Sequence, residues 1–354
     1  MTATGTGPIR AAVVGLGRAG YGIHVAAVRG REDFTLTAVA DPLEERRKQV
    51  AEEFGCKAFA SLEECLAGDD AELIAVATVS SDHARHSIAA LEAGRHVLVE
   101  KPMATRVADA DAMLAAARRS GTILTVNQHQ RLDPTVLYVK QLLHDGRLGE
   151  VFHIRRYSGG FARRNDWQTL RKYGGGSLNN NGVHVLDALY LLLESPVRDV
   201  WGDLRRINAA GDAEDHVKVV IRGYNERVID CELTSACALP QPEWVILGTR
   251  GTAIIARQDR RGPTMATIKW YEKDALPPLE VLDNTAAADR KYGVGEKIPF
   301  NEVQEPAKVD PGPGFYDRLY ATIRQGAPLL VDPESCRAVL DIMCRARVGT
   351  RFPD

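Results

Sequence analysis

The first third of the chain alternates short apolar, β-branched runs with longer stretches of helical spacing. The apolar runs predict five strands, over residues 9–14, 35–40, 73–77, 96–99 and 122–126. The stretches between them predict helices, over residues 19–28, 43–54, 82–93 and 104–120. Strands that alternate with helices pair in parallel, and right-handed crossovers place helices on both faces of the sheet. The pattern therefore predicts a doubly wound α/β domain over residues 1–127.

The pattern changes after this point. Helical spacing at residues 133–144 and 183–193 frames an apolar run at 150–157. Residues 217–222 and 229–234 then alternate apolar and polar side chains, the period of two that is typical of antiparallel strands with unlike faces. Residues 258–312 hold much of the proline and glycine and are predicted to be loop-rich, and helical patterns return at 314–324 and 333–347. We expect an α+β domain over residues 128–354, with an open and mainly antiparallel sheet.

Composition narrows the class of protein. The chain has 354 residues, of which 45% are hydrophobic and 26% charged, with a formal net charge of −2, as in an ordinary globular protein of two domains. Such a near-neutral chain lacks the positive field that nucleic acids or anionic membranes select, so neither is expected as a partner. No apolar run approaches the roughly 20 residues that cross a bilayer, and residues 1–8 show no signal-peptide core. A cytoplasmic location is expected.

Cysteine and histidine spacing favours neither disulfides nor a metal. The six cysteines are scattered without a Cys-x-x-Cys pair, which indicates free thiols in a reducing compartment. His83 and His86 are three residues apart on a predicted helix, but no third ligand lies at a recognisable distance. No metal is expected.

A glycine-rich turn follows the first predicted strand. Its residues match G-x-G-x-x-G and open a helix, and they are Gly15, Gly17, Arg18, Ala19 and Gly20, with Leu16 between the first two. Glycine allows the tight turn, the approach of backbone to a pyrophosphate and close helix-on-strand packing, and the helix amino end offers N–H groups to the anion. The context predicts a dinucleotide cofactor.

Asp41 ends the second predicted strand, 21 residues after Gly20. A carboxylate at this place accepts hydrogen bonds from ribose hydroxyls and repels a 2′-phosphate, which favours NAD over NADP. Asp41 is also placed to cap the helix that begins near Pro42, and the two roles are compatible. Arg46 and Arg47 lie one turn further on and leave NADP open as an alternative.

Glu100 and Lys101 terminate a buried apolar strand, at the edge of the sheet where doubly wound folds bind ligands. Lys101 should therefore project toward the cofactor. Hydride transfer leaves one proton to be moved, and partial burial beside a positive nicotinamide would lower the pKa of this lysine toward the neutral range.

A second polar constellation lies at residues 174–187. If a helix begins near Ser177 or Asn179, then Asn180, His184 and Asp187 form one polar stripe on it. A histidine facing a cleft can pass the proton that Lys101 accepts. The alternative is a capped helix in which His184 is a buried structural residue.

These motifs together resemble the Gfo/Idh/MocA oxidoreductase family, named for glucose–fructose oxidoreductase and inositol dehydrogenase. The resemblance covers nearly the whole chain and implies an N-terminal Rossmann domain and a second domain whose open sheet pairs with another subunit, as a homodimer or homotetramer. It also implies that Lys101 and His184 are catalytic. By the same resemblance, four residues line the dinucleotide, namely Thr78, His83, Glu100 and Asn127.

One residue departs from the family pattern. Many members carry an aspartate four residues before the histidine, where this chain has Asn180. An amide does not exchange a proton near neutral pH, although it donates and accepts hydrogen bonds. Either the proton is handled by His184 and Lys101 alone, with Asn180 holding a substrate hydroxyl, or the residue marks a branch with altered chemistry.

The substrate pocket is predicted from residues beside the second motif. Trp167 could stack on a sugar face, and Arg163 or Arg164 could bind hydroxyls or a carboxylate. Arg131 could line the same pocket from below. We expect an NAD-dependent oxidoreductase acting on a secondary alcohol or ketone of a sugar, sugar derivative or cyclitol. Two alternatives remain open: an NAD-dependent lyase or glycosidase that oxidises its sugar transiently, and a regulator that binds the dinucleotide without turnover.

Overall fold

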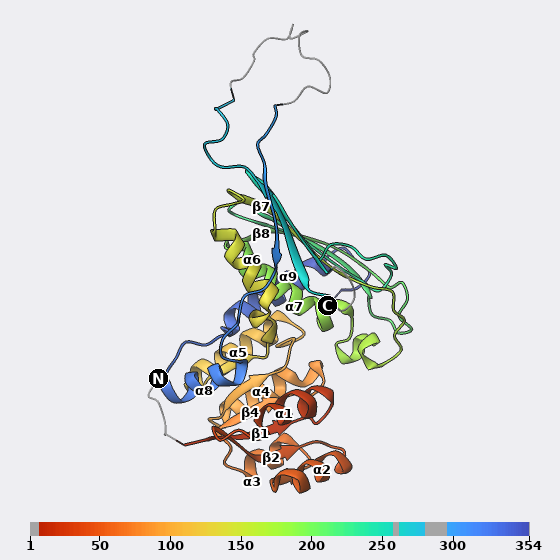
Figure 1. Ribbon diagram of the computed structural model, residues 1–354. Coiled ribbons are helices and arrows are strands. Elements are labelled where there is room, and N and C mark those ends of the chain that lie inside the picture. The colour runs from red at the N-terminus through yellow and green to blue at the C-terminus, as the bar shows by residue number, and fades with distance from the viewer. Residues whose placement is uncertain (1–6, 258–261, 280–295, 354) are drawn as a thin grey trace.

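Two sheets organise the protein, and helices lie against both of them (Figure 1). The computed structural model describes residues 7–257, 262–279 and 296–353. Parts of the predicted loop region, at 258–261 and 280–295, and the chain ends at 1–6 and 354 lie outside the described residues. None of the helices in the described ranges has both the length and the apolar character that a membrane crossing requires.

The first sheet is parallel throughout and has the strand order β3-β2-β1-β4-β5-β6. Its strands are β1 (Ile9–Val14), β2 (Phe34–Ala40), β3 (Lys57–Phe59), β4 (Leu73–Val76), β5 (His96–Val99) and β6 (Leu124–Val126). The five predicted strands are confirmed. The sequence did not reveal β3, because three residues at a sheet edge carry no periodic signal.

Helices cover both faces of this sheet. They are α1 (Ala26–Val28), α2 (Glu44–Phe54), α3 (Leu62–Gly68), α4 (His83–Glu92) and α5 (Val107–Ser120). Alternate residues of β1 enter opposite cores: Ala12 and Val14 pack with α3, α4 and α5, whereas Ala11 and Val13 pack with α1 and α2. The predicted doubly wound architecture is confirmed, and α3, whose seven residues are capped by Ser61, is an addition to it.

The second sheet is mainly antiparallel, with the order β14-β13-β12-β11-β7-β10-β9-β8 and one parallel pair, β7 with β10. Its strands are β7 (Val151–Gly159), β8 (Val197–Arg205), β9 (His216–Gly223), β10 (Val228–Thr234), β11 (Trp244–Gly248), β12 (Gly251–Arg257), β13 (Thr264–Trp270) and β14 (Asn301–Pro306). The loop-rich prediction for residues 258–312 is wrong where β13 and β14 lie. Local proline and glycine content does not register the pairing of β13 with β12 and of β14 with β13.

Three helices pack on one face of this sheet, namely α6 (Pro134–His144), α7 (Val183–Leu193) and α9 (Pro333–Arg347). The predicted alternation is confirmed, since the apolar residues at alternate positions of β9 and β10 are buried in this core, namely Val217, Val219, Ile221, Ile229, Cys231 and Leu233. Helix α8 (Phe315–Gln325) instead packs in the core of the first sheet, as its position beside the N-terminal layer shows (Figure 1). We propose that the two domains divide after Asn127 and that α8 contributes to the first domain.

Candidate active site

A cavity of about 1130 Å³ lies between the two domains. Its wall combines the glycine turn, the ends of β2, β4 and β5, and segments of the second domain around residues 166–168 and 173–180. The carboxyl edge of a doubly wound sheet is where such folds bind ligands. Most of the predicted cofactor residues meet here, namely Gly15, Gly17, Arg18, Ala19, Asp41, Thr78, His83, Glu100 and Lys101.

The glycine turn fits a pyrophosphate. Gly15 has φ +87°, and a Cβ there would lie 2.6 Å from the oxygen of Ala77, so this turn requires glycine. A Cβ on Gly20 would lie 1.7 Å from the oxygen of Gly15, which explains why Gly20 packs against the turn and not on the cavity wall. Gly17 faces open space, with nothing within 4 Å of its would-be Cβ. The turn is thus closed on its inner side and open where an anion would approach the helix amino end.

Asp41 is buried, and its carboxylate ties the end of β2 to the glycine turn. One oxygen accepts from the backbone N–H of Leu16 at 2.7 Å, and the other accepts from Leu43 at 2.9 Å. Arg46 stands 3.8 Å away, while Arg47 donates to the main-chain oxygens of Asp41 and Pro42. Each carboxylate oxygen keeps a second acceptor site for a ribose hydroxyl, so the capping and ribose-binding interpretations are compatible.

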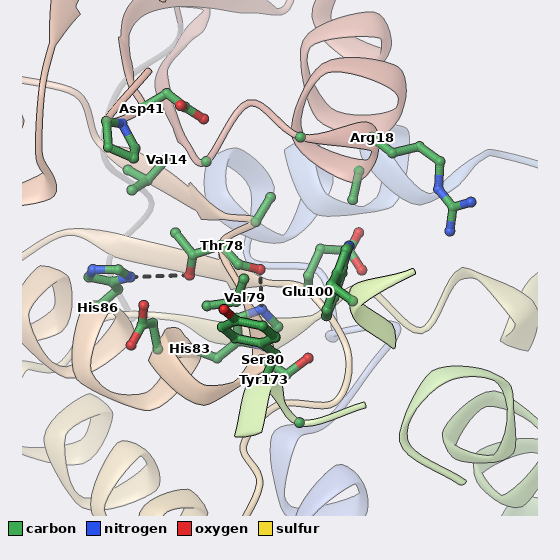
Figure 2. A pocket seen from close by; sticks show the side chains of 18 of the residues that line it. Val14, Arg18, Asp41, Thr78, Val79, Ser80, His83, His86, Glu100 and Tyr173 are labelled. Carbon is green, nitrogen blue, oxygen red and sulfur yellow. Dashed lines mark hydrogen bonds between the residues drawn. The ribbon is translucent and has the colours of Figure 1, made fainter. Parts of the chain in front are cut away.

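Two histidines of α4 organise the wall around Thr78. His83 is buried, with one ring nitrogen 2.7 Å from the oxygen of Pro102 and the other 3.1 Å from the oxygen of Thr78. The ring of His86 contacts the Thr78 hydroxyl at 3.1 Å, as the dashed lines in Figure 2 show. Burial lowers the pKa of both imidazoles. Both histidines are thus bonded to neighbouring protein groups and help to form the wall of the cavity.

Glu100 is the centre of a buried polar network. One carboxylate oxygen accepts from the Asn127 amide at 2.6 Å and lies 3.1 Å from the ring of His24, whose other nitrogen lies 2.7 Å from the Tyr316 hydroxyl. Burial opposes ionisation of Glu100, but the bonds from His24 and Asn127 and the charge of Lys101 outweigh it and lower the pKa to about 2. Glu100 is therefore a fixed negative charge behind Lys101, and Asn127 acts on the cavity through it.

Lys101 reaches across the cavity to the second domain. Its ammonium donates to the main-chain oxygen of Asn180 at 2.8 Å. Burial lowers the pKa of Lys101 from its ordinary value, and the charge of Arg18 adds to this effect while that of Glu100 opposes it. The lysine is thus held at the start of the helix that carries His184, in an environment that eases its deprotonation.

The helix that carries the second motif begins at Ser177, as predicted, and runs as a π-helical turn (Leu178–Gly182) into α7. Short π segments are frequent at functional sites. His184 lies one turn after Asn180 and is 5% exposed, and it is not on the wall of the described cavity. Its Nδ1 lies 2.7 Å from Oε1 of Gln128, and its ring meets that of His129 edge-on at 5.1 Å.

The surroundings of His184 keep it neutral. Burial, together with the nearby ammonium of Lys101 and imidazole of His129, lowers the pKa of His184 to about 3. Because an amide oxygen only accepts hydrogen bonds, Nδ1 carries the ring proton toward Gln128, and Nε2 keeps a lone pair. The influence of the Lys101 charge on His184 indicates that the two groups share one electrostatic environment.

The predicted substrate residues divide into two groups. Trp167 and Asn180 line the cavity. Arg163 is exposed and away from this wall. The prediction for Arg131 is wrong: its guanidinium is buried, donates to both oxygens of Asp187 at 2.8 and 2.6 Å, and bonds Ser335 at 2.7 Å. The motif around residue 131 gave no sign of this partner, which lies 56 residues away in the sequence.

Sequence reasoning missed four residues that shape the site, namely His24, Gln128, Gln168 and Tyr316. His24 follows Gly20 by one helical turn, and that spacing was a usable signal. Gln128 and Gln168 directly follow Asn127 and Trp167, which the sequence does single out, but amides carry no charge to mark them. Tyr316 had no signal, because it comes from a helix far along the chain.

Comparison with known proteins agrees with this geometry. Residues 9–128 match the family described as "Oxidoreductase family, NAD-binding Rossmann fold", and residues 136–254 match the "GFO/IDH/MocA C-terminal domain". The uncharacterized oxidoreductase YhhX of Escherichia coli is 26% identical over 338 residues, with 95% of each chain covered. The scyllo-inositol 2-dehydrogenase (NAD(+)) of Bacillus subtilis is 29% identical and covers 77% of this chain and 81% of its own.

A solved structure, an NAD-binding protein from Listeria innocua, superposes with a TM-score of 0.81 at 26% identity, covering 97% of this chain and 96% of its own. The two family matches together span more than half of the 354 residues, and both belong to one family. The chain therefore belongs to the Gfo/Idh/MocA oxidoreductases and is an NAD-dependent enzyme of that family.

Proposed function

We propose that the protein interconverts a secondary alcohol and the matching ketone on a sugar, sugar derivative or cyclitol. The observation that carries the proposal is the contact of Lys101 with Asn180, 2.8 Å between ammonium and main-chain oxygen, at the start of the helix that holds His184. A relative that acts on an inositol supports the class of substrate. Bound NAD supplies the hydride acceptor or donor of such a reaction.

Lys101 and His184 are suited to hold and move the proton of the substrate hydroxyl. In the oxidising direction this proton passes to Nζ of Lys101 or to Nε2 of His184, and in the reducing direction the same atom returns it. The lowered pKa of Lys101 favours its neutral, proton-accepting form relative to a free lysine, and the neutral ring of His184 keeps a lone pair on Nε2. Glu100 keeps its charge behind Lys101 throughout, because its pKa is about 2.

The test is a screen of sugars, uronates and inositols with NAD and NADP separately, followed by nicotinamide absorbance. We expect turnover with NAD, and we expect Lys101→Met and His184→Asn to lower kcat by roughly 10²- to 10⁴-fold while the dissociation constant for NAD stays near that of the wild type. Bond cleavage without accumulated NADH would instead support transient oxidation. Absence of any turnover across the panel would contradict the proposal.

We also propose that the outer face of the second sheet joins two or more copies of the chain. A row of paired positions crosses that face, and its apolar members are Trp201, Val220, Val245 and Ile254. Trp201 is 58% exposed and Ile254 is 42% exposed, which is unusual for large apolar side chains gathered on one flat face. Light scattering should report a dimer or tetramer, and the double variant Trp201→Glu/Ile254→Glu should report a monomer that still binds NAD.

A further inference from the structure

A chain of hydrogen bonds runs from the loop before the catalytic helix to Asn180. The guanidinium of Arg164 donates from one nitrogen to Asp166, at 2.6 Å, and to the side-chain oxygen of Gln168. The side-chain nitrogen of Gln168 donates to Oδ1 of Asn180 at 3.0 Å. Arg164 is thus the donor to both Asp166 and Gln168, and Gln168 in turn is the donor to Asn180.

The direction of this chain is fixed by its first member. A guanidinium has donors and no acceptor, so Gln168 must turn its oxygen toward Arg164. The amide nitrogen of Gln168 then faces Asn180, and only the oxygen of Asn180 can meet it. Nδ2 of Asn180 is consequently directed elsewhere, and no residue in the described part of the chain accepts from it, although Asn180 lines the cavity.

The backbone around Gln168 holds this arrangement in place. The main-chain oxygen of Gln168 accepts from Gly176 at 2.8 Å, and its N–H donates to Asp166 at 3.0 Å. Asn180 is fixed as well, because its own main-chain oxygen accepts from Lys101. Rotating the Asn180 amide would bring two NH₂ groups together, so the donor orientation is the stable one.

The charges near Asn180 favour an anion. Glu100 and Asp166, the two carboxylates on this part of the wall, are already bonded, to Asn127 and Arg164 respectively. Lys101 forms no ion pair with a carboxylate of the described ranges. The family aspartate that would add negative charge at position 180 is absent. An incoming ligand therefore meets an ammonium and an NH₂ donor, while Asp166 is paired with Arg164 and the charge of Glu100 lies behind Lys101.

We propose that Asn180 determines specificity by donating to a carboxylate that lies beside the reacting carbon, so that the substrate is an acidic sugar derivative. This inference rests on the proposed alcohol and ketone chemistry and names its substrate class. A hydrogen bond from an amide to a carboxylate is charge-assisted and stronger than one to a neutral hydroxyl. The neutral side chain at position 180 avoids the repulsion that an aspartate would exert on such a substrate.

The experiment uses pairs of compounds that differ only in the acid group: gluconate with glucitol, and glucuronate with glucose. Affinities for the enzyme saturated with NADH are measured by calorimetry, and kcat/KM is measured in parallel with NAD. We expect the acid of at least one pair to bind about 10-fold or more tightly than its neutral partner, and Asn180→Asp to weaken that acid by roughly 10- to 100-fold with little change in the neutral compound.

Two further variants test the mechanism. Asn181→Asp adds the same charge one residue away, outside the cavity wall, and should change neither affinity. In Gln168→Glu, the side chain at position 168 can no longer donate to Asn180. The Asn180 amide should then turn over, and the affinity for the acid should fall although residue 180 itself is unchanged. A merely structural role of Asn180 would instead change the affinities for the acid and the neutral compound together.

The outcomes separate the two proposals. Equal affinity for both members of each pair, or an equal loss for both in Asn180→Asp, overturns the assignment of Asn180. Selective binding of the acid without turnover of any compound leaves the assignment of Asn180 standing and overturns the proposed reaction.

Discussion

Arg131 holds Asp187 through two hydrogen bonds, of 2.8 and 2.6 Å, three residues after His184 on α7. Both side chains are buried, at 7% and 2% exposure. The pair joins the segment after β6 to α7, and Ser335 links it to α9. It therefore positions α7 from outside the cavity.

Removing only one member of this pair should strongly reduce the stability of the fold. Arg131→Met leaves a buried carboxylate without its partner, and we expect a loss of about 3–5 kcal/mol in the free energy of unfolding. The double variant Arg131→Met/Asp187→Leu removes both charges and should recover much of that loss. Urea denaturation of the three proteins provides the measurement, and a double variant as unstable as the single one would refute the expectation.

Folding stability should fall in mild acid. The pKa of His184 is about 3 in the folded protein against an ordinary value of 6.5. Between these values the unfolded chain binds a proton that the folded chain does not, so stability decreases as pH falls from about 6.5 toward 3. His184→Gln should reduce the slope of stability against pH in this window, with the remaining slope due to other buried histidines such as His83, whose pKa is also lowered. An unchanged slope would contradict the assigned environment.

The pH dependence of activity should reflect the ionisation of Lys101. Since its pKa is lowered from the ordinary 10.5 by burial, kcat/KM for alcohol oxidation should rise with pH through one ionisation below that value. His184 is already neutral and adds no step between pH 5 and 7. Steady-state rates across pH decide this, and a bell-shaped profile with a step near 6.5 would point to a titrating histidine instead.

Substitution of Gly20 should affect the stability of the fold, whereas substitution of Gly17 should affect NAD binding. Gly20→Ala places a Cβ 1.7 Å from the oxygen of Gly15 and should destabilise the fold. Gly17→Ala meets nothing within 4 Å in the protein, so the fold should persist while NAD binding weakens because the methyl group occupies the anion's approach. Gly7→Ala, which also meets nothing, is the matched control. Thermal unfolding and NAD titration distinguish the three variants.

Asp41 should set the preference for NAD. Removing its charge in Asp41→Ser is expected to raise the ratio of NADP to NAD efficiency by about 10- to 100-fold, because a 2′-phosphate no longer meets a carboxylate and Arg46 is free to approach it. The ratio of kcat/KM values for the two cofactors is the measure. Adding Arg46→Ala to Asp41→Ser should cancel much of the increase in this ratio. If Asp41→Ser leaves the ratio unchanged, Asp41 does not set the preference for NAD.

Local patterns predicted the parts of the fold that carry their own period. Strands β1 and β5 and helices α7 and α9 begin and end where the apolar spacing places them. Strand β3 was missed because its three residues show no period. Strands β13 and β14 were missed because they are held by pairing with other strands, β13 with β12 and β14 with β13. Pairing partners are a property of the whole chain and leave little trace in a short window.

The same division holds at the site. The glycine turn, Asp41, Lys101 and Asn180 were accessible because their motifs specify a local shape, and all of them line the cavity. The role of Arg131 was misjudged because its partner Asp187 is set by the packing of α7. A side chain's partner decides whether it faces a ligand or the interior, and that partner is seldom adjacent in sequence.

The contact of His24 with Tyr316 spans 292 positions along the chain. During translation the first sheet has all its strands long before α8 leaves the ribosome, so the network behind Glu100 stays unfinished until then. A nascent chain without α8 would thus lack the Tyr316 contact that supports His24, and this part of the network would form only after residue 325 has been made.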